Sequence, residues 1–289
     1  MKLLTLSGSI IPDKYRGGSA DSCKSRAVER RGAFVNGTQG YTHRYHPHPR
    51  LSASQIGDYL SANSTNRRRI LKDAKFPPAN IVIRYEDART ALRSHLATNG
   101  DGKSALNSAI VGFKRKSEYG DITPWKKQTY KLCSDALEIF QGTEPKMGLG
   151  STIFVTPTIH NSKLRISGVN VSVNLDLMTQ KVDNKGVKTI GGVILLFSKT
   201  KASEKDAAMR CQAIAMLAYE ILTSHAKANE TCDPRMCMAI DVFNGKVYRA
   251  KAQQKQLRNA VETSCEEVTA MWPNVKPPPK YNGPPIPKI

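Results

Sequence analysis

A dense run of basic side chains between residues 67 and 75 is the first feature of this sequence with a clear chemical meaning. The run consists of Arg67, Arg68, Arg69, Lys72 and Lys75. On a helix, residues 68, 72 and 75 share one face, because they are spaced by four and then three positions. A cationic stripe of this kind can follow a phosphate backbone, and arginine adds bidentate contacts to phosphate oxygens. We therefore predict phosphate contact here, against the alternative of a solvated helix face.

A second candidate is the loop sequence YTHRYHPHPR, which covers residues 41–50. Its three imidazoles are compatible with a metal site, but Pro47 and Pro49 exclude the regular helix that would aim the rings together. The preferred interpretation is a basic, aromatic loop that contacts phosphate or stacks on a base. Arg44 and Arg50 are the cations that this loop offers to phosphate.

The whole chain is strongly basic. Among its 289 residues, 44 Lys and Arg outnumber 24 Asp and Glu, which gives a net charge of +20. The excess is densest in the first 75 residues but extends along the chain. This spread indicates a basic surface of the folded body rather than one basic tail. Nucleic acid, either DNA or RNA, is the partner that such a surface predicts, and a generically basic protein is the alternative.

Several classes of protein are not expected from this composition. No apolar run approaches the roughly 18 residues of a membrane span, and the N-terminal stretch is too polar for a good signal peptide. No long helix pairs a basic face with a bulky aromatic one, so a membrane partner is not expected. The six cysteines contain no CxxC pair and are interpreted as reduced thiols. We expect a cytoplasmic protein without a resident cofactor.

The hydrophobic pattern predicts the elements that hold these side chains. Helices are expected from Ser52, over 125–141, from Ser203 and over 253–272, and strands over 151–158, 163–178, 191–199 and 236–243. The strand over 163–178 alternates between apolar residues and a polar set that ends at Asp176. Asn244 and Gly245 predict a type I′ turn.

Composition also suggests a division of the chain into four segments. These are a basic, loop-rich segment over 1–50, a basic helical region over 51–124, an α/β core over 125–272 and a proline-rich tail over 273–289. The tail has no means of building a hydrophobic core.

The order helix, three strands, helix, strand, with an acid on the second strand and a lysine on the third, resembles the PD-(D/E)XK nuclease superfamily. The chain looks most similar to its RecB-type exonucleases, including those associated with CRISPR, over about residues 51–70 and 125–243. LSASQIGDYL, which begins at Leu51, resembles the LSxSxLxxY helix of those proteins. By this resemblance Asp176 takes the place of the metal-binding aspartate, Lys199 that of the catalytic lysine and Gln212 that of the glutamine in QxxxY. The implied fold is α/β (α+β), a restriction-endonuclease-like core with a mostly helical and loop N-terminal region.

Two motif positions depart from the family pattern. Phe197 stands where the acid of the third-strand D/E-x-K motif belongs, and Met216 stands in place of the tyrosine of QxxxY. Such nucleases hold Mg²⁺ with clustered carboxylates while a lysine helps to activate water. Asp176 alone is a weak magnesium ligand, so Glu204 and Asp241 are the candidates for a relocated carboxylate. Their structural alternatives are a helix-dipole contact and a strand-end contact, respectively.

Three functions therefore stay open. The first is a nucleic-acid-binding protein with a degenerate catalytic centre, serving in a prokaryotic or mobile-element nucleoprotein complex such as one for antiviral defence. The second is an active Mg²⁺-dependent nuclease with a relocated carboxylate. The third is a structural adaptor whose proline-rich tail and N-terminal region recruit protein partners. Phe197 favours the first over the second, and the net charge of +20 counts against the third.

Overall fold

The computed structural model describes residues 40–80, 84–98, 102–150, 152–182, 186–198 and 203–287. These residues belong to one compact unit. Lys199, Cys23 and most of the expected loop-rich segment over 1–50 lie outside the described residues. The four-segment division of the chain stays a prediction.

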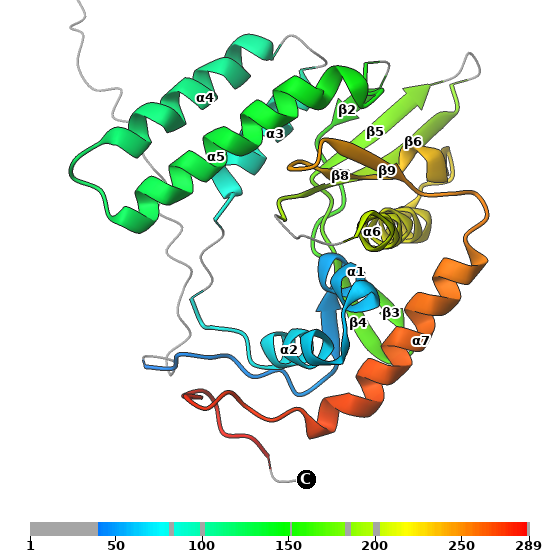
Figure 1. Ribbon diagram of the computed structural model, residues 1–289. Coiled ribbons are helices and arrows are strands. Elements are labelled where there is room, and N and C mark those ends of the chain that lie inside the picture. The colour runs from blue at the N-terminus through cyan, green and yellow to red at the C-terminus, as the bar shows by residue number, and fades with distance from the viewer. Residues whose placement is uncertain are drawn as a thin grey trace, which may run out of the picture. The chain divides into compact units, whose positions relative to one another are not determined.

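The strands form two sheets (Figure 1). The larger sheet has the order β2-β5-β6-β8-β9, with β7 beside β6, and the smaller has the order β1-β4-β3. In the larger sheet β2, β5 and β6 are antiparallel, β6 and β8 are parallel, and β9 returns antiparallel to β8. The strands are β1 (Arg50–Ser52), β2 (Ile153–Val155), β3 (Ser162–Ile166), β4 (Val169–Val173), β5 (Leu177–Val182), β6 (Lys188–Leu196), β7 (Glu230–Cys232), β8 (Met238–Asp241) and β9 (Lys246–Arg249).

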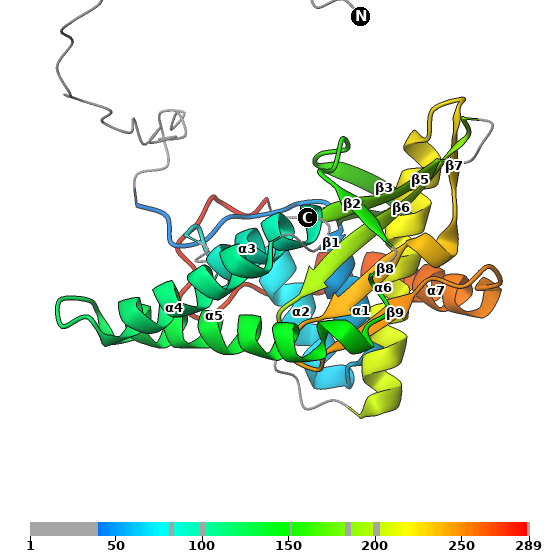
Figure 2. The same cartoon turned by 90° about the horizontal axis from the view of Figure 1, so that it is seen from above.

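Helices cover both faces of the larger sheet (Figures 1 and 2). On one face α3, α4 and α5 share a core with β5, β6 and β8. On the other face α6 packs against β6 and β8, and α1, α7 and the smaller sheet complete a second core around it. The α-helices are α1 (Ala53–Ser61), α2 (Ser64–Lys75), α3 (Glu86–Ala97), α4 (Lys103–Glu118), α5 (Pro124–Thr143), α6 (Glu204–His225) and α7 (Lys255–Met271). Short 3₁₀ helices are η1 (Glu144–Lys146), η2 (Pro234–Met236) and η3 (Trp272–Asn274).

Strand β6 is buried on both faces, as its continuous apolar run predicts. Val193 and Leu195 belong to the core under α3, α4 and α5, whereas Ile194 and Leu196 belong to the core around α6. Between α1 and α6 the approach is close at Gly57, where an added Cβ would lie 2.9 Å from the carbonyl oxygen of Arg210. The mixed α/β class expected from the sequence is confirmed at this level.

The expected single strand over 163–178 is wrong. Ser167 and Gly168 adopt positive φ angles of 44° and 85°, so the chain reverses there and β3 pairs antiparallel with β4. The chain then leaves the smaller sheet, and Leu177 begins β5 in the larger one. On β4 the predicted alternation is present, because Val169, Val171 and Val173 are buried. This alternation does not indicate that the chain reverses just before β4.

Locally encoded features are confirmed. Ser52 caps α1 with a reciprocal capping box to Gln55, and Ser203 caps α6 by accepting from the backbone N–H of Asp206. The turn expected at Asn244 and Gly245 is present, but its type I′ assignment is wrong. Asp241 pairs with Lys246 across a four-residue loop, and only Gly245 of that loop has a positive φ, of 60°.

The proline-rich segment after α7 packs onto the loop at 41–46. The backbone carbonyl of Asn282 accepts from the N–H groups of Thr42 and His43, at 2.7 and 3.0 Å. The ring of Tyr281 lies 5.8 Å from that of His43 and 5.2 Å from that of Phe76. None of the helices in the described part of the chain is long and apolar enough to cross a membrane.

Candidate nucleic-acid interface

The smaller sheet has one apolar face and one basic face. Parallel pairing places Arg50 of β1 beside Asn170 of β4, and antiparallel pairing places Lys163 beside Ser172 and Arg165 beside Asn170. These five side chains share the solvent face, because directly opposed residues point the same way. None of the residues in these three strands is acidic.

A pocket of about 180 Å³ opens at one end of this face. Its walls come from the loop before β1, from β1 itself and from β3 and β4: His46, Pro47, His48, Arg50, Lys163, Asn170 and Ser172. Arg50 Nη1 lies 3.4 Å from His46 Nε2. Burial lowers the pKa of His46, and the charges of Arg50 and Arg44 lower it further. The pocket thus holds two fixed cations and an imidazole whose protonation a bound anion would favour.

A second pocket, of about 340 Å³, continues past Ser172 along the same strand. Asn174 and Asp176 line it from the chain that follows β4, and Glu86, Arg89 and Arg93 line it from α3. We call the two pockets together the β4 groove, defined by Arg50, Lys163, Asn170, Ser172, Asn174, Arg89 and Arg93. Arg50 and Lys163 therefore flank one end of the polar strand β4, and Arg89 and Arg93 flank the other end.

Asp176 lies at the inner end of the β4 groove and is 5% exposed. Its Oδ2 accepts from Arg89 Nη1 at 2.6 Å and from the backbone N–H of Leu195 at 2.7 Å. Arg93 Nε lies 4.0 Å from Oδ1. A guanidinium thus neutralises the buried carboxylate directly, and a backbone N–H completes its hydrogen bonding.

Phe197 helps to seat that guanidinium. The Arg89 Cζ lies 5.1 Å from the centre of the Phe197 ring, within the range of a cation–π contact. Tyr85 stacks on Phe197 with ring centres 5.4 Å apart. The aromatic residue at the position of the expected acid therefore supports an arginine instead of supplying an oxygen ligand.

The donor set around Asp176 does not fit a magnesium ion. Mg²⁺ requires carboxylate oxygens and retains several waters in an octahedral shell, whereas Oδ2 of Asp176 already contacts a cation and a backbone donor. Glu86, the other acid in the pocket, contacts Arg93 Nη2 at 2.7 Å and Arg89 Nε at 3.8 Å. Among the described residues, no group of three or more His, Cys, Asp or Glu could hold a metal ion.

The other expected catalytic residues lie apart from this pocket. Glu204 is exposed at the start of α6 and forms an ion pair with Lys246, which lowers the pKa of the Glu204 carboxyl. Gln212 is half-buried further along α6. Asp241 is buried at the end of β8, where its carboxylate accepts from the backbone N–H and the Nδ2 of Asn244. Neither Glu204, Gln212 nor Asp241 lines the pocket of Asp176, and Lys199 lies outside the described residues.

The basic run on α2 is largely committed to internal contacts. Lys75 is buried, and its Nζ donates to the carbonyl oxygens of Trp272, Pro273 and Val275 at 2.7, 3.3 and 3.3 Å. Burial lowers the pKa of Lys75, while these carbonyls stabilise its charged form. The expectation that Lys75 contacts phosphate is therefore wrong, because its ammonium group is enclosed by backbone oxygens.

Arg67 is also engaged within the protein. Its Nη1 lies 2.9 Å from Glu267 Oε2, its Nε donates to the carbonyl of Tyr59, and its Cζ lies 4.9 Å from the centre of the Tyr59 ring. The other members of the run are Arg68 and Arg69, which are exposed, and Lys72, which is half-exposed. Arg44 is exposed and donates to the carbonyl of Ala79 at 3.0 Å. Of the seven residues expected to contact phosphate, Arg50 is the one that lines the β4 groove.

Four cations of this interface were not singled out by the sequence reasoning: Lys163, Arg165, Arg89 and Arg93. Lys163 and Arg165 alternate with Leu164 and Ile166 and therefore share one strand face. An unbroken strand over 163–178 would put that face with Val169 and Val171, whereas the reversal brings it beside Asn170 and Ser172. For Arg89 and Arg93 the only signal is their spacing of four, which places them on one side of a helix.

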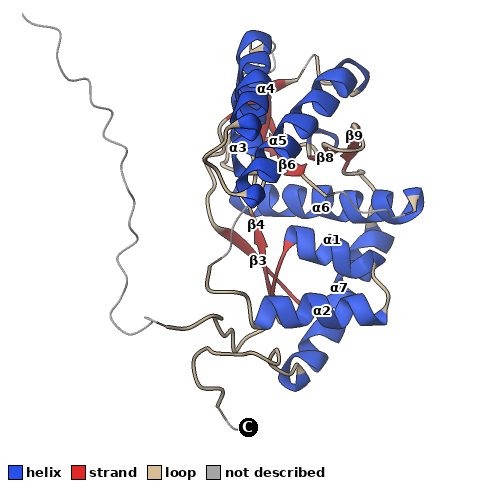
Figure 3. Cartoon of the chain, turned by 60° about the vertical axis from the view of Figure 1, so that its left-hand side comes forward, coloured by secondary structure: helices blue, strands red, loops and turns tan. Residues whose placement is uncertain are grey.

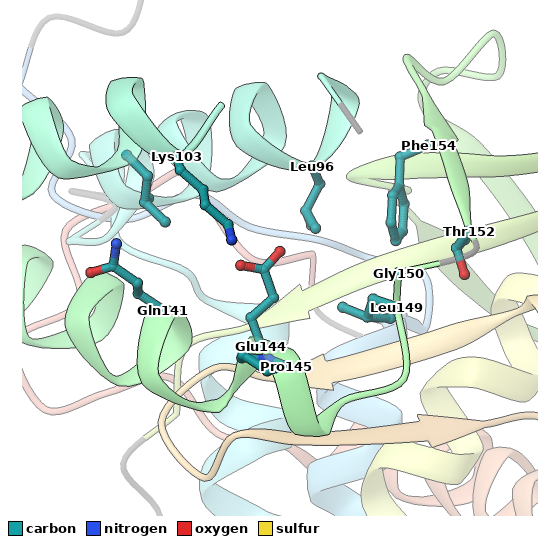
Figure 4. A pocket seen from close by; sticks show the side chains of 10 residues that line it. Leu96, Lys103, Gln141, Glu144, Pro145, Leu149, Gly150, Thr152 and Phe154 are labelled. Atoms are coloured by element: carbon teal, nitrogen blue, oxygen red, sulfur yellow. The ribbon is translucent and has the colours of Figure 1, made fainter. Parts of the chain in front are cut away.

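A separate pocket of about 620 Å³ lies between α3, α4, η1 and β2 (Figure 4). Leu96, Leu149 and Phe154 form apolar walls, and Lys103 points toward Glu144 across the opening. Glu144 also contacts Nε2 of the buried His95 at 2.9 Å. Because Lys103 and Glu144 carry opposite charges, this pocket lacks the cationic excess of the β4 groove.

The described cysteines offer no activated nucleophile. All five are free, and burial raises the pKa of Cys211, Cys237 and Cys265 to about 12 and that of Cys133 to about 11. At these pKa values the thiolate is scarce near neutral pH.

No protein-family model matches the chain, and a search of curated proteins finds no match. Functional inference therefore depends on the geometry of the site itself.

Proposed function

We propose that this protein binds nucleic acid in the β4 groove and does not cleave it. The observation that carries the proposal is the pair Arg50 and Lys163 on a polar strand face without an acid. Arg89 and Arg93 extend this row, although each is paired with an acid, Asp176 and Glu86 respectively. Phosphates of a nucleic-acid backbone repeat along a line, so a row of cations flanking small polar side chains matches them in charge and shape. The chain's net charge of +20 supports the same partner.

The absence of cleavage follows from the state of Asp176. A metal-dependent nuclease needs free carboxylate oxygens to bind divalent ions against the scissile phosphate. Here Arg89 occupies the side of Asp176 that such an ion would need, and Phe197 holds Arg89 in place. Arg89 thus neutralises Asp176 as a fixed group of the protein and does not activate water. The positive charge that favours phosphate comes mainly from Arg50 and Lys163 in the other pocket of the groove.

The scaffold supports a relationship with the PD-(D/E)XK superfamily. Helix α5 precedes the antiparallel strands β2, β5 and β6, and α6 then leads to β8, which is parallel to β6. The larger sheet taken alone follows the order helix, three strands, helix and strand, whereas the chain also inserts the β3–β4 hairpin between the first and second of these strands. Asp176 immediately precedes the second of these strands. We therefore propose a nuclease-like scaffold whose catalytic position has been converted into an arginine-based anion site.

Binding and cleavage are tested together. The purified chain is incubated with labelled single- and double-stranded DNA and RNA, with Mg²⁺, with Mn²⁺ and with EDTA. We expect binding in all three conditions and no degradation products. Arg50→Gln/Lys163→Gln should weaken binding roughly tenfold or more, because each lost phosphate contact removes a released counterion. The control pair Lys251→Gln/Lys255→Gln removes the same charge from exposed positions outside the groove and should leave affinity nearly unchanged.

The rival nuclease has a distinct signature. Metal-dependent degradation that is abolished by Asp176→Ala and by Lys199→Ala, in protein that remains folded by circular dichroism, would overturn the non-cleaving proposal. If Arg50→Gln/Lys163→Gln and the control Lys251→Gln/Lys255→Gln weaken nucleic-acid binding equally, the β4 groove is not the binding site.

A further inference from the structure

The α4–α5 hairpin carries a second surface with the chemistry of a nucleic-acid contact. Its two helices pack through one apolar stripe on each, formed by Leu106, Ile110 and Phe113 on α4 and Cys133, Leu137 and Phe140 on α5. The loop that joins them, residues 119–123, points away from the strands (Figures 1 and 2). The hairpin lies on the opposite side of the larger sheet from α2 and α7 (Figure 3).

Two large aromatic side chains stand exposed at the tip of this hairpin. Tyr119, just after α4, is 52% exposed, and Trp125, in the first turn of α5, is 42% exposed. Covering an exposed Trp side chain removes apolar surface from water and is therefore favourable. Thr123 caps α5 by accepting from the N–H of Lys126, and Pro124 fixes the first helical residue. Trp125 is therefore presented from a rigid helix start and loses little freedom when it is covered.

The surroundings of these rings are cationic. Between residues 111 and 131 the chain has six basic residues against the two acids Glu118 and Asp121. Five of the basic residues, Lys114, Arg115, Lys116, Lys126 and Lys131, are exposed, and Lys114 forms an ion pair with Glu138. The start of α5 adds the positive end of a 20-residue helix dipole at the same tip. This charge selects a polyanion as the occupant rather than an apolar protein surface.

We infer that the hairpin tip binds single-stranded nucleic acid, with Trp125 and Tyr119 stacking on unpaired bases and the surrounding Lys and Arg side chains contacting phosphates. Aromatic rings can stack only on bases that are out of a duplex, so the tip discriminates by strandedness rather than by sequence. This inference rests on the proposed function and extends it, because it adds a strand-selective contact to the β4 groove.

Tryptophan fluorescence reports on this contact directly. The chain has two tryptophans, and Trp272 is 2% exposed while its Nε1 lies 3.2 Å from the carbonyl oxygen of Pro47. Titration of the full chain with an unlabelled single-stranded oligonucleotide should quench the exposed Trp125, and a duplex of equal length should not. Trp125→Phe should lose the quenching but keep its affinity within a few-fold, since phenylalanine still stacks.

Affinity measurements with labelled oligonucleotides complete the test. Tyr119→Ala/Trp125→Ala should weaken single-strand binding by roughly 5- to 150-fold per lost stack while duplex binding stays unchanged. Val111→Ala, at an exposed apolar position on α4 of the same hairpin, is the matched control and should change neither. Unchanged single-strand binding by the double variant, or no quenching by any oligonucleotide that binds, would overturn the inference.

The same data separate this inference from the proposed function. If Arg50→Gln/Lys163→Gln weakens all binding while the hairpin variant binds normally, the groove proposal stands and the hairpin inference fails. If single-strand binding and Trp125 quenching persist undiminished in the groove variant, the hairpin is the site and the groove proposal fails.

Discussion

The basic run on α2 and the β4 groove differ in how their cations are used. The run has five cations within nine residues, yet Lys75 is enclosed by three carbonyls and Arg67 is paired with Glu267. The β4 groove draws its cations from three elements, β1, β3 and α3, and they lie along one polar strand. Density of charge along a sequence therefore does not measure charge on a surface, since packing decides which ammonium and guanidinium groups remain available to a ligand.

The two regions also have in common a cation that binds protein atoms. Each contains a buried or partly buried cation held by protein atoms: Lys75 at the end of α2 and Arg89 at the inner end of the groove. Lys75 binds backbone oxygens of the segment after α7 and closes the second core. Arg89 binds a carboxylate and still lines a pocket. Substitution of each cation separates its contribution to stability from its contribution to binding.

The largest effect is expected for Lys75→Met. The substitution removes three hydrogen bonds from a charged donor, and the bond to the carbonyl of Trp272 is buried, so unfolding free energy should fall by about 2–4 kcal/mol. Urea denaturation followed by circular dichroism measures the change. Lys72→Met, one turn earlier and half-exposed, should change stability by less than about 0.5 kcal/mol. Similar midpoints for the two variants would show that the enclosed amine is not structural.

Arg89→Met should have the next largest effect on stability. It leaves the buried Asp176 with one backbone donor and only the more distant Arg93 guanidinium as counter-charge, at a cost of about 2–3 kcal/mol. The cost is less than for a fully buried pair because Arg89 is partly exposed. Arg89→Met/Asp176→Leu removes both charges and should recover most of that loss, as a denaturation cycle of the four proteins will show. Failure of the double variant to recover would mean that Arg89 stabilises the fold through Phe197 rather than through Asp176.

The sequence predicts elements well where the signal is local. The Ser203 cap and the apolar stripe of α6, and the continuous apolar run of β6, are encoded within one turn or one strand. The β3–β4 reversal at Ser167 was missed because alternation on β4 looks the same whether the chain continues or turns back. For the site, the family resemblance singles out Asp176 as a metal ligand, but nothing in the sequence indicates its partner Arg89. Arg89 is 87 residues away, and β1 meets β4 across more than a hundred residues, so only the fold brings these cations together.

Salt dependence compares the two regions as binding surfaces. Arg50→Gln/Lys163→Gln should reduce the slope of log affinity against log salt by about 2, since each side chain neutralises one phosphate. Arg68→Gln/Arg69→Gln removes the same charge from α2. Because these two residues do not line the groove, this pair should change the slope by less than about 1. Fluorescence anisotropy over a salt series measures both. A larger change for the α2 pair would transfer the main interface to α2, as the sequence alone predicts.

The smallest effect is expected at His46, and it tests whether the outer pocket of the groove receives an anion. Burial and the charges of Arg50 and Arg44 lower the pKa of His46 in the folded protein. The unfolded chain, with an ordinary pKa near 6.5, therefore binds more protons as pH falls below that value. Stability should fall on acidification through this window, by less than about 1 kcal/mol because the ring is partly exposed.

A phosphate bound beside His46 should give the affinity for nucleic acid the opposite pH dependence to that of the stability. An anion in the pocket favours the imidazolium, so complex formation takes up a proton and affinity should rise as pH falls below about 6.5. Anisotropy titrations between about pH 5.5 and 7.5, with His46→Asn beside the wild type, measure this linkage. His46→Asn should flatten the pH dependence of affinity, whereas His48→Asn, which alters the exposed neighbour, should change it less. If wild type and His46→Asn lose or gain affinity in parallel, no phosphate occupies this pocket, and the anion site lies at the Arg89 end of the groove.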